Sequence, residues 1–244
     1  MAVPDLSRSA QRKNGTVATG GVLSAEVDYA AVPHSPNVKP QGSRLTRGRR
    51  WETLGLAGAT VWFTGLPAAG KSTIAGAVEE RLVIAGRPAL LLDGDQLRHG
   101  LNGDLGFDEA ARSENVRRTA HVARLVAEAG TIAVVSLVSP YVRDREAAVA
   151  LHAAIDLPFI EVFVDAPLEL CEQRDPKGLY ARARAGELAG LTGVGAPYEA
   201  PTRPDLALHT DSETVEMAVE RVMAALDARF CASTSNRWAA RASQ

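Results

Sequence analysis

This 244-residue sequence has only two cysteines, no long apolar run and no large excess of either charge. The two cysteines, Cys171 and Cys231, are too few for a disulfide framework and lack the spacing of metal ligands, so we expect two reduced thiols. A formal net charge of −2 provides no basic field, which argues against a nucleic-acid partner. The longest apolar run, residues 131–138, is far shorter than the roughly 20 residues of a membrane span, and no signal-peptide run begins the chain. These absences predict a globular, cytoplasmic protein without a membrane contact.

The first 50 residues differ in composition from the rest of the chain. They mix Gly, Pro, Ser and Asn, carry eight Lys or Arg against three Asp or Glu, and show no sustained periodicity. We interpret residues 1–50 as a mobile extension whose basic end, residues 44–50, is a solvated linker rather than a phosphate site. The expected organisation is this extension, one domain over residues 51–230 and a short tail over 231–244.

Short β-rich runs alternate with amphipathic helical segments from residue 60 onward, which is typical of βαβ units. The predicted strands are residues 61–64, 89–93, 131–138 and 159–164, with 206–209 a weaker fifth. Their nearly continuous hydrophobicity indicates burial on both faces of a parallel sheet. Covering helices are predicted from apolar residues at helical spacing: Ile74, Val78 and Leu82; Val116, Ala120, Ala123 and Ala127; Val215, Val219, Val222 and Leu226. The sequence therefore predicts an α/β three-layer sandwich with a parallel five-stranded sheet and helices on both faces.

A glycine-rich loop follows the first predicted strand and precedes a predicted helix. It matches the phosphate-binding pattern G-x-x-x-x-G-K-[ST] with Gly65, Leu66, Pro67, Ala68, Ala69, Gly70, Lys71, Ser72 and Thr73. Backbone N–H groups of such a loop surround phosphate oxygens, and the helix N-terminus adds a favourable field. We expect Lys71 to bridge the β- and γ-phosphates of ATP and Ser72 to ligate Mg²⁺. A chance glycine-rich turn is the alternative, but the strand and helix around the motif favour a P-loop NTPase-type domain.

Two carboxylates, Asp93 and Asp95, follow the second predicted strand. They should lie at the carboxyl edge of the sheet beside the phosphate loop, where open α/β sheets bind ligands. Asp95 is our candidate to accept a hydrogen bond from an attacking hydroxyl, with Lys71 as the other catalytic residue. Asp93 is a candidate to hold Mg²⁺ through water, whereas capping of the next turn is the structural alternative for either aspartate.

Several longer motifs resemble those of the adenylylsulfate kinase family, in the same order, over about residues 50–228. They are LDGD at 92–95, GF at 106–107, RSENVRR at 112–118, SPY at 139–141 with DR at 144–145, FVDAP at 163–167, RDPKGLY at 174–180, ARAGE at 183–187 and PYEAP at 197–201. The resemblance implies transfer of the γ-phosphoryl group of ATP to the 3′-hydroxyl of adenylyl sulfate, which gives 3′-phosphoadenylyl sulfate. It also implies a role in sulfate assimilation, a homodimer, and sulfate adenylyltransferase as a functional partner.

The acceptor's anionic groups require donors, and the segment after Asp95 provides them. Arg98 and Arg112 offer planar forks that suit phosphate or sulfate oxygens, and Asn115 lies three residues beyond Arg112 on the same helical face. The resemblance implies that Phe107 stacks on a purine, although residue type alone favours burial in a core.

Ser139 should reach the same edge of the sheet, because it follows a buried strand. The resemblance implies that Val138 and Ser139 contact the adenine of the acceptor, and that the matching serine of bacterial members forms a phosphoserine. Direct in-line transfer needs no protein nucleophile, so we keep Ser139 as a site residue and leave its covalent role open.

Residues 174–195 are rich in glycine and basic residues, as expected of a lid that closes over charged nucleotides. The resemblance implies that Lys177 reaches the acceptor, that Arg174 lies near the ATP base, and that Leu191 and Thr192 pack on the adenylyl group. A flexible surface loop is the alternative.

The sequence departs from the family pattern within the phosphate loop, where Pro67, Ala68 and Ala69 replace the common Ser-Gly-Ala. Gln96 likewise stands where Asn is common, and Leu137 and Val138 replace Phe-Ile. Two other functions remain open: a P-loop kinase of another small alcohol, and a non-catalytic nucleotide-binding regulatory module. The chain lacks an Asn-Lys-x-Asp guanine-reading motif and keeps both Asp95 and Lys71, which argues against the regulatory module.

Overall fold

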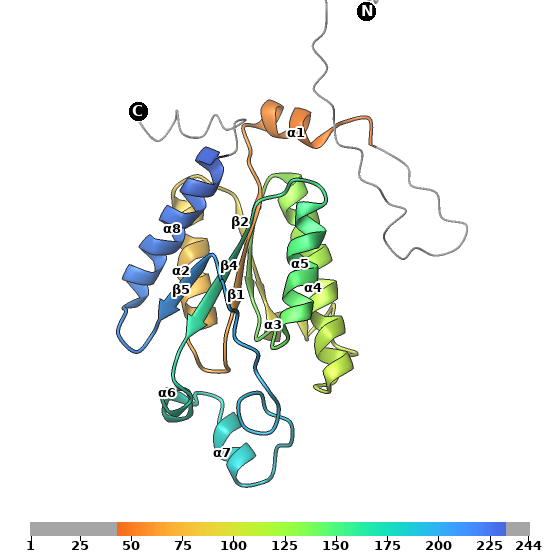
Figure 1. The fold of residues 1–244 in the computed structure, drawn as a ribbon. Coiled ribbons are helices and arrows are strands. Elements are labelled where there is room, and N and C mark those ends of the chain that lie inside the picture. The colour runs from red at the N-terminus through yellow and green to blue at the C-terminus, as the bar shows by residue number, and fades with distance from the viewer. Residues whose placement is uncertain (1–42, 233–244) are drawn as a thin grey trace, which may run out of the picture.

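The computed structural model describes residues 43–232 (Figure 1). Its elements follow in chain order: α1 (Arg47–Leu54), β1 (Ala59–Thr64), α2 (Lys71–Ile84), β2 (Ala89–Asp93), α3 (Gly94–Leu97), α4 (Glu109–Ala129), β3 (Ile132–Ser136), α5 (Val142–Ala153), β4 (Phe159–Asp165), α6 (Leu168–Arg174), α7 (Leu179–Arg184), β5 (Leu206–His209) and α8 (Val215–Ala232). Residues 1–42 and 233–244, which hold most of the expected extension and tail, lie outside the described residues.

The five strands form one parallel sheet in the order β2-β3-β1-β4-β5, which confirms the predicted architecture. β2 and β5 have the predicted bounds, whereas β1 begins two residues earlier than expected, at Ala59. β3 is shorter than expected, because it ends at Ser136. Leu137 and Val138 are apolar because the chain stays close to the core after it leaves the sheet, and Leu137 is only 4% exposed.

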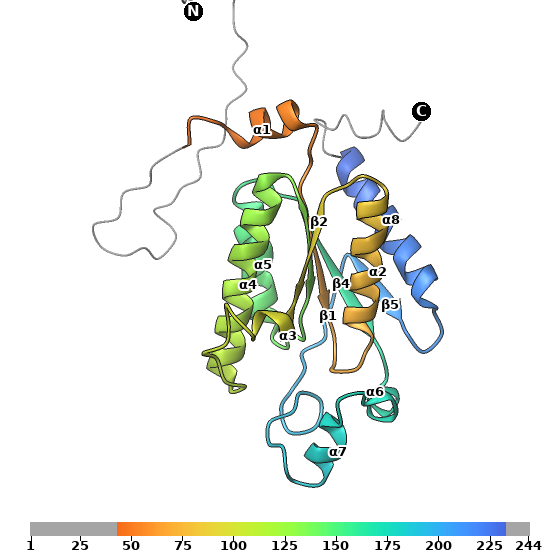
Figure 2. The ribbon, with the colours of Figure 1, turned by 180° about the vertical axis from the view of Figure 1, so that it is seen from behind.

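Helices cover both faces of the sheet: α2 and α8 lie on one face, and α4 and α5 lie on the other (Figures 1 and 2). Side chains alternate across the central strand β1, so that Val61 and Phe63 pack with α2 and α8 while Trp62 packs with α4. The apolar positions predicted for three helices are buried, except Val215, which is partly buried. Both ends of α4 have clear capping residues. Asp108 caps its N-terminus, and Gly130 ends it with a φ of 100°.

The helices α1 and α5 were not expected from the sequence. α1 contains the boundary that we expected between residues 50 and 51, and it lies at the end of the sheet opposite α6 and α7 (Figure 1). Its Trp51 donates a hydrogen bond from Nε1 to the carbonyl of Glu128 over 3.0 Å. Within residues 43–232, no helix is long and apolar enough to span a bilayer.

Candidate active site

The phosphate loop and the ends of β1, β2 and β3 meet at one edge of the sheet, because carboxyl ends of parallel strands share an edge. The helix α7, which belongs to the predicted lid segment, and α6, which ends where that segment begins, lie at the same end of the molecule (Figures 1 and 2). The side chains predicted to carry the chemistry therefore come from neighbouring strands and from one overlying segment.

The phosphate loop connects β1 to α2, and its backbone requires glycine at two positions. A Cβ atom on Gly65 would lie 2.5 Å from the carbonyl oxygen of Val164, and Gly70 has a φ of 104°. Ala68 also has a positive φ, of 59°, at a position where the family commonly has glycine. Tyr180 of α7 donates its hydroxyl to the carbonyl of Pro67 over 3.0 Å, which ties the lid segment to the loop.

Lys71 is the first residue of α2, and its side chain is 8% exposed. The ammonium donates to the carbonyl oxygens of Gly65 and Leu66 over 3.0 and 2.7 Å. Burial lowers the pKa of Lys71 to about 8, and the nearby carboxylates of Asp93 and Asp95 partly oppose that shift. The phosphate loop and the acidic end of β2 are thus close enough for their charges to interact.

Oxygen atoms gather where α2 begins and β2 and β3 end. Ser72 donates its hydroxyl to Oδ2 of Asp93 over 2.7 Å and lies 3.1 Å from the hydroxyl of Ser136. Oδ1 of Asp93 accepts from the backbone N–H of Asp95 over 3.0 Å, so this aspartate also caps α3, as the structural alternative predicted. Mg²⁺ prefers hard oxygen ligands and keeps several waters, so the donor set fits this ion. In residues 43–232 no three His, Cys, Asp or Glu side chains form a metal cage.

The sequence alone did not identify Ser136, because we expected β3 to continue to residue 138. The only available signal was a hydroxyl residue within an otherwise apolar strand.

Asp95 and Lys177 form an ion pair between the end of β2 and the lid segment. Both side chains are more than half exposed, at 65% and 59%. The two residues predicted to act on the acceptor therefore lie in direct contact, although 82 positions separate them in the sequence.

Phe107 is 64% exposed, so the core position that residue type alone favours is wrong. The guanidinium of Arg98 lies 4.1 Å from the centre of its ring, and that of Arg112 lies 5.9 Å from it. Arg112 also donates to the carbonyl oxygens of Phe107 and Gly190 over 2.8 and 3.1 Å, which joins the start of α4 to the lid segment. An exposed aromatic ring can stack on a nucleotide base, and the two arginines beside it can bind the phosphate or sulfate groups of that nucleotide.

Ser139 directs its hydroxyl into the sheet. The residue is 3% exposed and has a φ of 38°. Its Oγ accepts from Nε1 of Trp62 over 3.2 Å and donates to Oγ1 of Thr64 over 2.9 Å. Thr64 also donates to the carbonyl of the half-buried Val138 over 2.9 Å. The hydroxyl of Ser139 is thus fully engaged in packing the turn against β1.

Arg174 lies beside the phosphate loop, whereas Leu191 and Thr192, near the end of the lid segment, are buried. Arg174 donates from Nη1 to the carbonyl of Ala69 and to Oγ1 of Thr210, over 3.3 and 3.0 Å, on the β5 side of the phosphate loop. Leu191 and Thr192 are 7% and 0% exposed, so neither offers an exposed side chain to a ligand in this arrangement. Oγ1 of Thr192 has no hydrogen-bond partner among the described residues.

The sequence analysis also missed the role of Arg145, although its motif was noted. This residue is 2% exposed and contacts three segments. It donates to Oε1 of Glu161 over 2.8 Å and, over 2.7 Å each, to the carbonyl oxygens of Ser139 and Glu199. Burial raises the pKa of Glu161, whereas the charge of Arg145 opposes that shift. Arg145 thus fixes the Ser139 turn and the segment that follows the lid.

The family model described as "Adenylylsulphate kinase" matches residues 57–209. The chain belongs to the adenylylsulfate kinase family. It is 48% identical over 182 residues to the adenylyl-sulfate kinase of Aeromonas salmonicida, which covers 75% of this chain and 92% of that protein. It is 49% identical over 207 residues to the "Bifunctional enzyme CysN/CysC" of Mycobacterium tuberculosis, which covers 85% of this chain. The chain spans only 33% of that bifunctional protein.

A solved adenylylsulfate kinase also shares the fold. The APS kinase CysC of Mycobacterium tuberculosis, in complex with AMPPNP and APS, has a TM-score of 0.69 and is 48% identical. The match covers 70% of this chain and 99% of that one. Family membership and the P-loop fold predicted from the motifs are therefore confirmed, and the roles of the individual site residues stay predictions.

Proposed function

We propose that this protein is an adenylylsulfate kinase, which transfers the γ-phosphoryl group of ATP to the 3′-hydroxyl of adenylyl sulfate. The observation that carries this proposal is the arrangement at one edge of the sheet. Ser72, which ends the phosphate loop, donates to Asp93, and Asp93 accepts from the backbone N–H of Asp95. Phe107 lies against Arg98 and Arg112 in the segment after α3. The solved relative described as a complex with AMPPNP and APS supports the same pair of substrates.

The phosphates of ATP would bind at the N-terminus of α2, where backbone N–H groups and Lys71 provide positive charge. Ser72 would hold Mg²⁺ directly, and Asp93 would hold it through water. When bound, this ion supplies positive charge to the β- and γ-phosphates. The side chain of Asp95 would accept the hydrogen bond of the 3′-hydroxyl and align it with the γ-phosphorus. Lys177 would remain close to that carboxylate and to the developing negative charge.

Direct transfer between the two nucleotides is favoured over a phosphoserine at residue 139. The Ser139 hydroxyl is buried and already bonded to Trp62 and Thr64, and a nucleophile requires an accessible oxygen and a nearby base. We therefore assign Ser139 to the shape of the acceptor site. Mass spectrometry after incubation with Mg-ATP alone tests this assignment, since a phosphorylated Ser139 would contradict it.

A two-substrate assay tests the proposed function. Purified protein is supplied with Mg-ATP and either adenylyl sulfate or competing alcohols, such as nucleosides and sugar acids, and the product is identified. We expect 3′-phosphoadenylyl sulfate. Efficient phosphorylation of another alcohol would instead favour a different P-loop kinase, and ATP binding without turnover on any acceptor would favour a regulatory module.

Two variants test the assigned roles. Asp95→Asn should abolish transfer and leave ATP binding nearly unchanged, whereas the control Asp227→Asn on α8 should retain activity. Arg112→Ala should raise the KM for adenylyl sulfate much more than the KM for ATP. Unchanged turnover of the first variant, or equal effects of the second on both substrates, would contradict these roles.

We also propose that the enzyme works in the cytoplasm, where ATP is available, and that it forms a homodimer. A separate sulfate adenylyltransferase would supply its substrate. Analytical ultracentrifugation tests the oligomeric state.

A further inference from the structure

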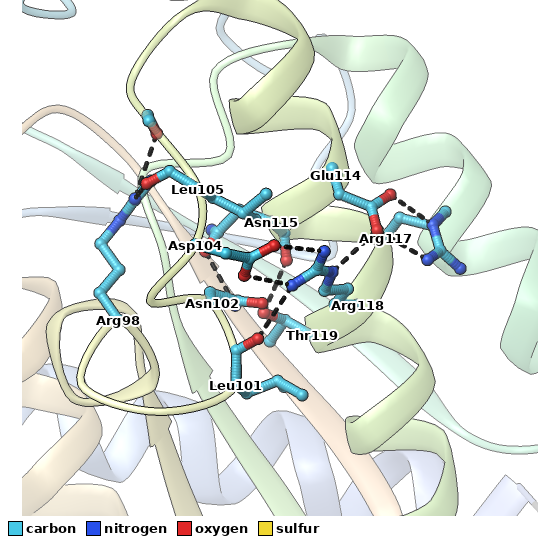
Figure 3. Close-up of polar contacts among 11 residues, drawn as sticks. Arg98, Leu101, Asn102, Asp104, Leu105, Glu114, Asn115, Arg117, Arg118 and Thr119 are labelled. Atoms are coloured by element: carbon cyan, nitrogen blue, oxygen red, sulfur yellow. Dashed lines mark hydrogen bonds and ion pairs between the residues drawn. The ribbon is translucent and has the colours of Figure 1, made fainter.

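The loop between α3 and α4 carries Phe107, and Arg118 of α4 binds its outer part (Figure 3). Nη1 of Arg118 donates to the carbonyl of Leu101 over 3.0 Å. The same guanidinium binds both carboxylate oxygens of Asp104 over 2.6 and 2.9 Å. Its Nε donates to Glu114 over 2.8 Å. These contacts hold the outer part of the loop against the first turns of α4.

The inner part of the loop contributes one fully buried polar side chain, that of Asn102, which is 0% exposed. Its Nδ2 donates a hydrogen bond to Oδ1 of Asn115 over 2.9 Å (Figure 3). Its own Oδ1 has no hydrogen-bond partner among residues 43–232. An unsatisfied buried carbonyl costs free energy, so apolar packing alone does not explain an asparagine here. The side chain's one hydrogen bond goes to a residue that we assign to the acceptor site.

The bond to Asn102 determines which end of the Asn115 carboxamide is free. Because Oδ1 of Asn115 accepts from Asn102, its two remaining donors are on Nδ2. That atom makes no hydrogen bond to any described residue. The backbone of the same residue is fixed separately, since Thr119 donates to its carbonyl over 2.8 Å. Asn115 is 8% exposed, and its two remaining donors belong to the face of α4 that carries Arg112 one turn earlier, which we assign to an anionic ligand.

The opposite orientation of the carboxamide would be unfavourable for the same ligand. If Asn115 turned by half a rotation, its oxygen lone pairs would face the phosphate or sulfate oxygens of the acceptor. A hydrogen bond from N–H to a charged oxygen would then be replaced by repulsion.

We propose that Asn102 is a positioning residue that orients the carboxamide of Asn115 so that it donates hydrogen bonds to the anionic group of the acceptor nucleotide. This inference rests on the proposed function. Asn102 itself contacts neither substrate, and it acts only through Asn115.

The primary variant is Asn102→Leu, which keeps the branched shape and removes the donor. We expect the KM for adenylyl sulfate to rise about ten- to a hundredfold, the value of a hydrogen bond to a charged group, while the KM for ATP changes less than about twofold. Arg118→Ala is the matched control, because it loosens the same loop without contacting the Asn115 carboxamide. It should lower the melting temperature and raise the KM for adenylyl sulfate much less. Equal effects of the two variants on this KM would overturn the proposal in favour of simple loop anchoring.

A double-mutant cycle separates positioning from structure. In an Asn115→Ala background, Asn102→Leu should cause no further rise in the KM for adenylyl sulfate, because the group that it orients is already absent. Additive effects would overturn the proposal. If the wild-type protein phosphorylates adenylyl sulfate and Asn102→Leu leaves its KM unchanged, only this inference fails. If the wild-type protein does not use adenylyl sulfate, the proposed function fails instead.

A second variant tests the orientation even if Asn102→Leu does not fold. Asn115→Asp keeps an oxygen that can accept from Asn102, although burial of its charge lowers the melting temperature by itself. Its second carboxylate oxygen would face the anion and raise the KM for adenylyl sulfate more than Asn115→Ala does. A KM for adenylyl sulfate no higher than that of Asn115→Ala would show that the second oxygen does not face the anion, which would overturn the proposal.

Discussion

The buried imidazole of His152 should make the fold sensitive to mild acid. This side chain on α5 is 0% exposed. Its Nδ1 lies 2.8 Å from the carbonyl of Ala148, which can only accept, so Nδ1 carries the proton. Nε2 then accepts from the hydroxyl of Thr60 over 2.9 Å, and the folded protein requires the neutral ring. Burial, with smaller contributions from the charges of Arg124 and His121, lowers the pKa of His152 to about 4, although its hydrogen bond to Ala148 opposes this.

The sign and size of the effect follow from the lowered pKa. The unfolded chain binds a proton at His152 as the pH falls through the ordinary value of 6.5, whereas the folded protein does not bind it until about pH 4. Stability from this residue is therefore complete above the ordinary value and is lost between the two. The expected loss is about 2 kcal/mol by about pH 5 and approaches about 3 kcal/mol at lower pH.

Urea unfolding at about pH 7.5 and about pH 5 measures this loss. We expect the free energy of unfolding of His152→Gln to change less between the two pH values than that of the wild type, by about 2 kcal/mol. The exposed His99→Gln is the control and should behave as the wild type. If His152→Gln and the wild type lose the same free energy between these pH values, the assignment of a neutral buried imidazole is refuted.

Three further substitutions give separate tests. Ser136→Ala should raise the Mg²⁺ concentration for half-maximal turnover by about tenfold, because its hydroxyl orients Ser72; an unchanged requirement would remove Ser136 from the metal site. Ala68→Gly should stabilise the protein by up to about 1 kcal/mol in thermal unfolding, because glycine adopts a positive φ without strain, and a lower melting temperature would contradict this. Arg145→Met should destabilise the protein by about 3 kcal/mol in urea, because it leaves Glu161 buried without its partner. Adding Glu161→Leu should recover the part of that loss that comes from the unpaired carboxylate, and no recovery would argue against the ion pair as a cause.

The missed helix α5 shows a limit of reading apolar periodicity. Its buried residues are Arg145, Ala148 and His152. Two of these three are polar, so no apolar stripe indicates the helix from sequence. Their burial depends on partners in β1 and β4 that are distant in the chain. In contrast, the helix α2 follows its pattern, because Ile74, Val78 and Leu82 are all buried.

The phosphate loop and the positions of the strands could be predicted because each depends on local sequence. The partners of the site residues could not. Ser136 approaches Ser72 only through the register of β1 and β3, and Asn102 meets Asn115 only after the loop between α3 and α4 folds back. The lid was expected from its glycine and basic residues, yet its Tyr180 is 1% exposed and packs in the main core.

Because β1 is the central strand, the groups proposed to bind the two substrates lie on opposite sides of it. The stacking and anion-binding residues assigned to the acceptor, which are Arg98, Phe107, Arg112 and Asn115, come from one stretch of chain after β2, whereas Arg174 lies on the β5 side. This contiguous piece of chain would supply much of the acceptor site, while Asp95, Ser139 and Lys177 would complete it from other segments. Exchanging that piece between relatives offers a route to new acceptors in which the nucleotide donor, and the scaffold that holds it, stay the same.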